Sequence, residues 1–243
     1  MPDFPMRLNK YLAHKGYATR RAADDLIERG RVLVNGRVAQ LGDKVDSTDT
    51  VEVRQSKRAK KQSYAYFAYN KPRGIVSHSP GEREEDIRDS LPELGELGVF
   101  PIGRLDKNSH GLIILTNDGR ITDRLLNPDR EHDKEYTVRT KLPLRKSFKK
   151  HIEEGVDIEG YLTKPAKVRV LGEKAFALTL NEGKKHQVRR MVVAMHNEVE
   201  DLKRNRILNI RLGNLKSGQV RPIEGDELAE FLARLGLGEP LEQ

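Results

Sequence analysis

The sequence contains no cysteine and no tryptophan, and only 5% of its residues are aromatic. Without cysteine the chain forms no disulfide, offers no thiolate nucleophile and cannot bind zinc or an iron-sulfur cluster through sulfur. This absence fits the cytoplasm, which is the location we predict. No apolar run approaches the roughly 20 residues needed to span a bilayer, and the N-terminus lacks a long apolar segment resembling a signal peptide. We therefore expect no membrane partner.

Positive charge is what the sequence has in excess. Lys and Arg number 45 against 37 Asp and Glu, which gives a net charge of +8. Such a surplus favours a polyanionic partner, and nucleic acid is the main candidate once a membrane surface is set aside. The 243 residues suffice for one large domain or two unequal ones.

The N-terminal segment has the pattern of two short helices. Leu8, Tyr11 and Leu12 are spaced as the buried face of a helix. A second helix is expected between an N-cap at Thr19 and a stop at Gly30. Its expected inward-facing residues are Ala22, Ala23, Leu26 and Ile27.

A hairpin is expected next. Asn35-Gly36 is a strong signal for a type I′ turn between short strands that contain Val34 and Val38. Residues 6–53 as a whole resemble the alpha-L RNA-binding module, the ribosomal-protein S-four type, in "RLNKYLA", "TRRAADDLI" and "GRVLVNGRV". The resemblance implies that basic residues of this module contact an RNA backbone, namely Arg7, Lys10, Arg20 and Arg21. The alternative interpretation is an ordinary solvated charged surface.

A linker is predicted at residues 54–62, "RQSKRAKKQ", because this stretch has no apolar residue larger than alanine to bury. The predicted organisation is a module at 1–53, the linker at 54–62 and a larger domain at 63–243.

The larger domain has several strand patterns and few helices. Strands are expected in "YAYFAYNK", "KEYTVRT", "KVRVL", "AFALTL" and "RILNIRL". One helix should follow Gly183, because Val188, Met191, Val192 and Met195 are spaced at i, i+3, i+4 and i+7, and another should begin at Asp226. The fold class we predict is α+β, with a small N-terminal module and a larger domain built on a mainly antiparallel sheet.

Asp106 is the candidate catalytic residue. It lies in "GRLDKNSHG", between expected strands at 99–102 and 112–115, and a loop held by two strands supports a side chain rigidly. Many aspartates at such positions only cap a turn. Arg104 nearby, however, would favour the ionised carboxylate and orient it.

The surroundings of Asp106 limit its chemistry. The common glycosidases need a pair of carboxylates and metal nucleases need several, whereas this loop has one acid. The acids of "GEREED", including Glu84, are interpreted as a solvated loop. One carboxylate supported by arginine suits a nucleophile or a base.

Four motifs in order, "NKPRGI", "GRLDKNSHGLIILTNDG", "HDKEYTV" and "EGKKHQVRRM", make the chain resemble the pseudouridine synthases. Together with the N-terminal module they are similar to the RsuA, RluB and RluF branch, nearest to the RluF-like large-subunit enzymes. The resemblance covers nearly the whole chain. It implies isomerisation of one uridine in ribosomal RNA, in 23S RNA or a large-subunit assembly intermediate, by a monomer that needs no cofactor and no metal.

The resemblance also implies roles for single residues. Asp106 is the catalytic carboxylate that helps to detach uracil from its ribose, and Arg104 helps to hold the target nucleotide flipped out of its helix. Tyr136 stacks on the target base, Arg189 pairs with Asp106, and Leu180 packs under the uracil unless it belongs only to the core.

Two further basic residues, Lys71 and Arg190, are expected to contact the RNA backbone, with a purely structural role as the alternative for Lys71. The chain departs from the family pattern at Ser109-His110, where many members have a Thr-Ser-like pair, and His110 is a candidate for altered contacts to neighbouring nucleotides.

Two other functions remain open from the sequence. The chain could be a non-catalytic RNA-binding or ribosome-assembly protein that uses the fold as a platform, or an enzyme of the same chemistry that acts on transfer RNA.

Overall fold

The computed structural model describes residues 4–15, 17, 20–54, 64–77, 85–127 and 130–238. Several positions discussed above lie outside the described residues: Thr19, Glu84, linker residues 55–62 and the side chain of Arg21. No helix within the described ranges is long and apolar enough to cross a membrane.

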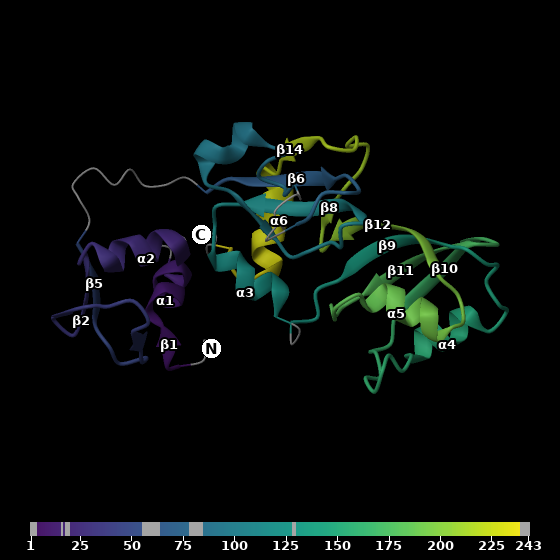
Figure 1. Ribbon diagram of the computed structural model, residues 1–243, viewed down its shortest axis with the longest axis horizontal. Coiled ribbons are helices and arrows are strands. Elements are labelled where there is room, and N and C mark those ends of the chain that lie inside the picture. Colours follow the sequence, from purple (N-terminus) through teal and green to yellow (C-terminus); the bar gives the residue numbers. More distant parts are fainter. Residues whose placement is uncertain are drawn as a thin grey trace.

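The N-terminal module consists of two helices and short strands (Figure 1). In order these are β1 (Met6–Arg7), α1 (Leu8–His14), α2 (Arg20–Glu28), β2 (Val32–Val34), β3 (Arg37–Val38), β4 (Lys44–Val45) and β5 (Val51–Val53). Strand β2 pairs with β3 and β5, and β1 pairs with β4. The expected helix, helix, hairpin order is confirmed.

Its local details follow the sequence pattern with one exception. Asn35 and Gly36 have φ of 50° and 79°, the positive values that a type I′ turn requires. Leu12 and Ala23 are fully buried between the helices. Ala22 was expected to face inward and is exposed instead, because Ala23 and Ile27 already fill the buried stripe of α2.

The larger domain is built on one nine-stranded sheet. Its elements are β6 (Tyr66–Lys71), the 3₁₀ helix η1 (Pro92–Leu97), β7 (Phe100–Ile102), β8 (His110–Thr116), α3 (Arg120–Leu126), β9 (Lys134–Thr140), α4 (Phe148–Glu154), β10 (Lys167–Gly172), β11 (Ala175–Leu180), α5 (Gln187–Ala194), β12 (Val199–Ile207), β13 (Ile210–Arg211), β14 (Val220–Pro222) and α6 (Gly225–Arg234).

The strand order is β10-β11-β9-β12-β8-β6-β14, with β7 paired to β8 and β13 to β12. Between the described strands of this sheet every pairing is antiparallel except β8 with β12. The α+β class with a mainly antiparallel sheet is therefore confirmed.

Strand β8 is buried on both faces. Successive side chains of a strand point to opposite faces, and here Ile113 and Leu115 enter one apolar core while Leu112 and Ile114 enter another. The first core includes residues of α4 and α5, and the second includes residues of α3 and α6 (Figure 1). With apolar cores on both of its faces, β8 is a rigid support for the loop that precedes it.

One expected strand was wrong. "RILNIRL" is two strands, because the backbone turns at Leu208, with φ of 52°, between the end of β12 and the start of β13. Most of β12 lies upstream, in "VEDLKRN". Its inward face combines Leu202 with a buried arginine, Arg204, and this hid the apolar alternation.

Candidate active site

The loop that carries Asp106 joins β7 to β8 and approaches the middle of the sheet, between β6 and β12. Gly111, at the start of β8, is in register with Lys71 of β6 on one side and with Arg204 of β12 on the other. Its φ is +105°, and a Cβ atom there would collide with the carbonyl oxygen of Arg204. Glycine is therefore required for the three strands to approach each other below the loop.

Backbone hydrogen bonds fix the shape of this loop. The Ser77 hydroxyl donates to the carbonyl oxygen of Leu105 at 2.8 Å and accepts from the Leu105 amide at 3.0 Å. The Ser109 amide donates to the carbonyl oxygen of Asp106, and the Gly74 amide donates to that of Lys107, both at 2.9 Å. These contacts tie the loop to the segment after β6.

Lys71 lies beneath the loop and is 0% exposed. Its ammonium donates to the carbonyl oxygens of Pro72 at 2.8 Å, Ile75 at 2.6 Å and Lys107 at 3.5 Å. Burial lowers the pKa of Lys71 to about 8, while nearby Asp106 raises it and Arg204 lowers it further. The expected contact of Lys71 with the RNA backbone is wrong, because this side chain cannot reach solvent. Its role is structural.

Arg204 is the second buried cation at this position, and the sequence analysis did not identify it. Its Nε donates to the carbonyl oxygen of Leu112 at 2.7 Å and its Nη1 to that of Arg104 at 3.3 Å. The side chain is only 4% exposed. Arg204 thus joins the two ends of the catalytic loop. A single sequence carries no signal that marks a buried arginine of this kind, because its partners are backbone carbonyl groups.

Two basic side chains from the α5 region, a histidine and an arginine, face Asp106, whose side chain is 33% exposed. His186 Nε2 lies 3.4 Å from Oδ1, and Arg189 Nε lies 3.5 Å from Oδ2. Arg189 also donates from Nη2 to the hydroxyl of the buried Ser109 at 3.0 Å. The arginine is thereby connected to the loop at two points.

The ion pair expected between Arg104 and Asp106 is not formed among the described residues, so this part of the sequence interpretation is wrong. Arg104 is exposed, while the next residue, Leu105, is buried in the core. Arg189 and His186 take the expected place beside the carboxylate. The Arg104 side chain remains available to solvent.

Apolar side chains line the core next to the loop. Tyr136 and Leu180 are 9% and 3% exposed and belong to the same apolar cluster as Leu105. Leu180 therefore lies in the core, whatever further contact it makes. Tyr136 is in register with Arg204 on β12, which places it near the loop.

The basic residues predicted to contact RNA differ in their surroundings. Arg7 and Arg20 are exposed and Lys10 is half-buried. Arg190 donates from Nη2 to the carbonyl oxygen of Ile158 at 2.6 Å and to Glu159 at 2.8 Å. Because its guanidinium is held within the protein, the expected RNA contact of Arg190 is not supported.

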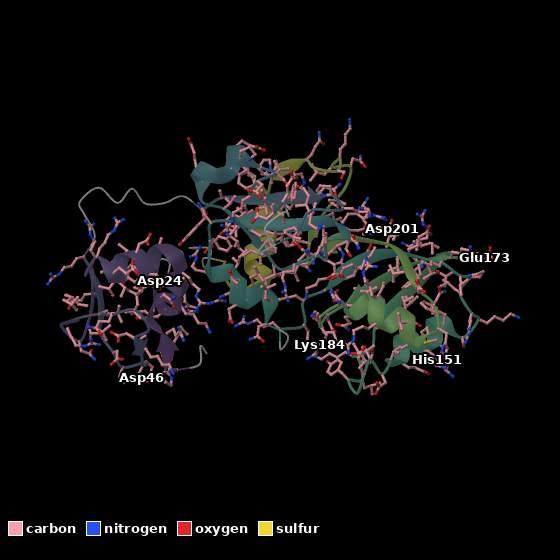
Figure 2. All side chains as sticks on the ribbon, viewed as in Figure 1. Asp24, Asp46, His151, Glu173, Lys184 and Asp201 are labelled. Atoms are coloured by element: carbon pink, nitrogen blue, oxygen red, sulfur yellow. The ribbon has the colours of Figure 1, made fainter. Side chains whose placement is uncertain are left out.

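His110 faces the protein. Its Nε2 lies 2.8 Å from Oδ1 of Asp201 on β12, and Arg73 pairs with the same oxygen. Asp201 is labelled in Figure 2. Burial raises the pKa of Asp201, but the hydrogen bonds from Arg73 and His110 outweigh that effect and hold the pKa below its usual value. His110, where the chain departs from the family pattern, thus joins the start of β8 to β12, and Arg73 joins the segment after β6 to the same aspartate.

A single carboxylate that faces a histidine and an arginine, on a loop supported by the sheet, can act as a nucleophile or as a base. The described residues hold no group of three or more His, Cys, Asp or Glu side chains placed to bind a metal ion.

Comparison with known proteins identifies the fold and the chemistry. The family described as RNA pseudouridylate synthase matches residues 65–194, more than half of the chain. The chain belongs to the RNA pseudouridine synthases. An S4 domain matches residues 6–51, so the protein is a pseudouridine synthase of the RsuA, RluB and RluF branch, and it is an isomerase. The non-catalytic alternative is set aside.

Relatives match over nearly the whole length. The chain is 38% identical over 233 residues to the dual-specificity RNA pseudouridine synthase RluF of Escherichia coli K12, covering 95% of this chain and 80% of that one. It is 36% identical to the ribosomal large subunit pseudouridine synthase B of Bacillus subtilis, covering 93% and 96%. A solved pseudouridylate synthase is similar with a TM-score of 0.68 at 29% identity, covering 95% of this chain and 99% of that chain.

Proposed function

We propose that this pseudouridine synthase isomerises one specific uridine of large-subunit ribosomal RNA, with Asp106 as the catalytic carboxylate. The observation that carries the site assignment is that each Asp106 oxygen lies next to one basic side chain, His186 or Arg189, on a loop held by two buried cations. The ribosomal target is supported by the S4 domain and by the large-subunit relative from Bacillus subtilis.

The reaction needs a flipped nucleotide, because a base stacked in a helix does not expose its glycosidic bond to a side chain. We assign Arg104, which is exposed beside the loop, to hold the flipped nucleotide, and Tyr136 to stack on its base. Asp106 then attacks the sugar or base, or removes a proton from the sugar. The detached uracil rotates and rejoins the ribose through carbon.

Pseudouridine mapping tests the function in cells. Both ribosomal RNAs would be mapped in a strain lacking the gene and in the same strain expressing the wild type or Asp106→Asn. We expect one position in the large-subunit RNA to be lost and to return only with the wild type. In vitro the variant should be at least about 10³-fold slower, since it has lost its acid-base or nucleophilic group.

Restoration by Asp106→Asn would contradict the assignment of the carboxylate. Loss of a transfer RNA position instead would show that the substrate is transfer RNA. Transfer RNA should therefore be mapped in the same experiment, because one relative is named a dual-specificity RNA pseudouridine synthase.

A further inference from the structure

The two basic side chains that face Asp106 carry different groups. Arg189 carries a guanidinium, which keeps its charge throughout the accessible pH range, and it is hydrogen-bonded to the buried Ser109. His186 carries an imidazole, and this side-chain type changes charge between about pH 5 and 8. Its side chain is 51% exposed, so protons exchange with solvent directly.

The position of His186 is built into the fold. It precedes α5 in the left-handed conformation, with φ of 52°, which is uncommon for a residue with a side chain. Such a conformation persists only where the surrounding structure enforces it.

The enforcing structure is a buried carboxylate. Glu182 is 3% exposed and accepts hydrogen bonds from the Gln187 side chain, from the Tyr161 hydroxyl at 2.6 Å and from the Lys164 amide at 3.1 Å. Gln187 in turn accepts from the Lys184 amide at 2.9 Å. Both ends of the 184–187 turn are therefore fixed, and His186 is held over Asp106; Figure 2 shows Lys184 beside α5.

We infer that His186 is a positioning residue whose charged imidazolium holds the second oxygen of Asp106, so that two fixed cations orient the carboxylate. The inference rests on the proposed role of Asp106 and deepens it. With Arg189 alone, one oxygen is held and the carboxylate can rotate about its Cβ–Cγ bond. With His186 charged, both oxygens are held in the reactive orientation.

Other charged groups face this pair from neighbouring elements. Arg189 lies on α5, Lys71 of β6 is buried below the loop and interacts with Asp106, and Lys185 precedes His186 in the chain. Burial lowers the pKa of Lys71 to about 8. A change in rate on the acid side of that value therefore separates His186 from Lys71.

The test is the single-turnover rate of tritium release from large-subunit ribosomal RNA transcribed with uridine labelled at C5, measured from about pH 6 to pH 9. The variants are His186→Gln, which has no charge, and His186→Arg, which has a permanent one. His196→Gln is the matched control, because His196 is an exposed histidine with a left-handed φ of 57° just beyond the other end of the same helix.

We expect His186→Gln to be about fivefold slower than the wild type near pH 6, with the difference shrinking toward pH 9, because histidine side chains in general lose their charge between about pH 5 and 8. His186→Arg should match the wild type near pH 6 and exceed it near pH 9. His196→Gln should follow the wild type throughout.

A gap between wild type and His186→Gln that is absent or independent of pH would overturn the inference, as would a His186→Arg variant as slow as His186→Gln. An active Asp106→Asn variant in the same assay would overturn the proposed function as well. If Asp106→Asn is inactive and the His186→Gln gap is independent of pH, this inference alone fails.

Discussion

At the scale of single residues, Lys71 makes the catalytic loop sensitive to alkaline pH. Its pKa is about 8, below the ordinary 10.5, chiefly because the side chain is buried. Below pH 8 the ammonium has three N–H groups for its three carbonyl acceptors, whereas the neutral amine has only two. A hydrogen bond from a charged donor is worth about 1.5–3 kcal/mol, so we predict a rate at least about tenfold lower well above pH 8.

The folding stability should rise with pH, whereas the reaction rate falls. Between about pH 8 and 10.5 the unfolded chain keeps the Lys71 proton that the folded protein has released, so the unfolded state binds more protons. The free energy of unfolding contributed by Lys71 therefore rises with pH across this range. Relative to Lys71→Met, the wild type should gain stability in urea titrations as the pH is raised, while its rate of tritium release falls.

Lys71→Met is also the control for the predicted fall in rate above pH 8. Lys71→Met should be slower than the wild type at pH 7 and should lack the decline near pH 8. The same decline in both proteins would assign it to another group.

At the scale of elements, the crossing of β6, β8 and β12 at Gly111 holds the site together. We predict that Gly111→Ala lowers the free energy of unfolding by at least about 2 kcal/mol, because a Cβ there collides with the β12 backbone as well as straining a φ of +105°. Urea denaturation measures the change. Gly160→Ala is the matched control, since Gly160 has a φ of +84° with no atom near its Cβ position.

Both variants strain a backbone with positive φ, but only Gly111→Ala also makes a Cβ atom collide with β12. The difference between their losses in free energy of unfolding therefore measures the cost of the collision. Equal losses would show that the close approach of β8 and β12 relaxes at little cost. A larger loss at Gly111 should be accompanied by reduced activity, because the strands below the loop would have separated.

The sequence analysis predicted elements that local patterns define better than elements that depend on contacts between distant parts of the chain. Local patterns gave the helices of the N-terminal module, the Asn35-Gly36 turn and strands such as β9, because periodicity and turn chemistry act over a few residues. Helices α3 and α4 were not predicted. Each buries only two apolar side chains, Ile121 and Leu125 in α3 and Phe148 and Ile152 in α4, which is too few to define an apolar stripe in the sequence.

The candidate site was predictable only where a motif marked it. Asp106 and Arg189 were found through resemblance, and the structure places them together. Arg104 was assigned to Asp106 because it is near in sequence, whereas the basic side chains that face the carboxylate come from α5 and the residue before it, 80 or more positions later in the chain. Arg204 was missed because a buried arginine that binds backbone carbonyls has no signature in a single sequence.

At the scale of the whole molecule, the N-terminal module should supply much of the electrostatic attraction for RNA. Arg7, Lys10 and Arg20 are the described residues of the predicted contact face. Replacing all three with glutamine should reduce the slope of log K against log salt by about 2 to 3, because each phosphate contact releases close to one counterion. Fluorescence anisotropy with ribosomal RNA fragments over a salt series measures the slope.

The matched control replaces three exposed lysines of the larger domain, Lys146, Lys150 and Lys174, and leaves the net charge equal to that of the test variant. A slope reduced equally in both would indicate a general charge effect without a defined contact face. The division of the chain at residues 54–62 stays a prediction, because most of that stretch lies outside the described residues.

The contact of Arg204 with Arg104 has a consequence for protein synthesis. The two residues are 100 positions apart in the chain, so the loop carrying Asp106 leaves the ribosome well before the side chain that joins its ends. At about 5–20 residues per second, that interval lasts roughly 5 to 20 seconds. A nascent chain therefore exposes its signature motif long before it can modify RNA, and activity begins only when translation of the larger domain is nearly complete.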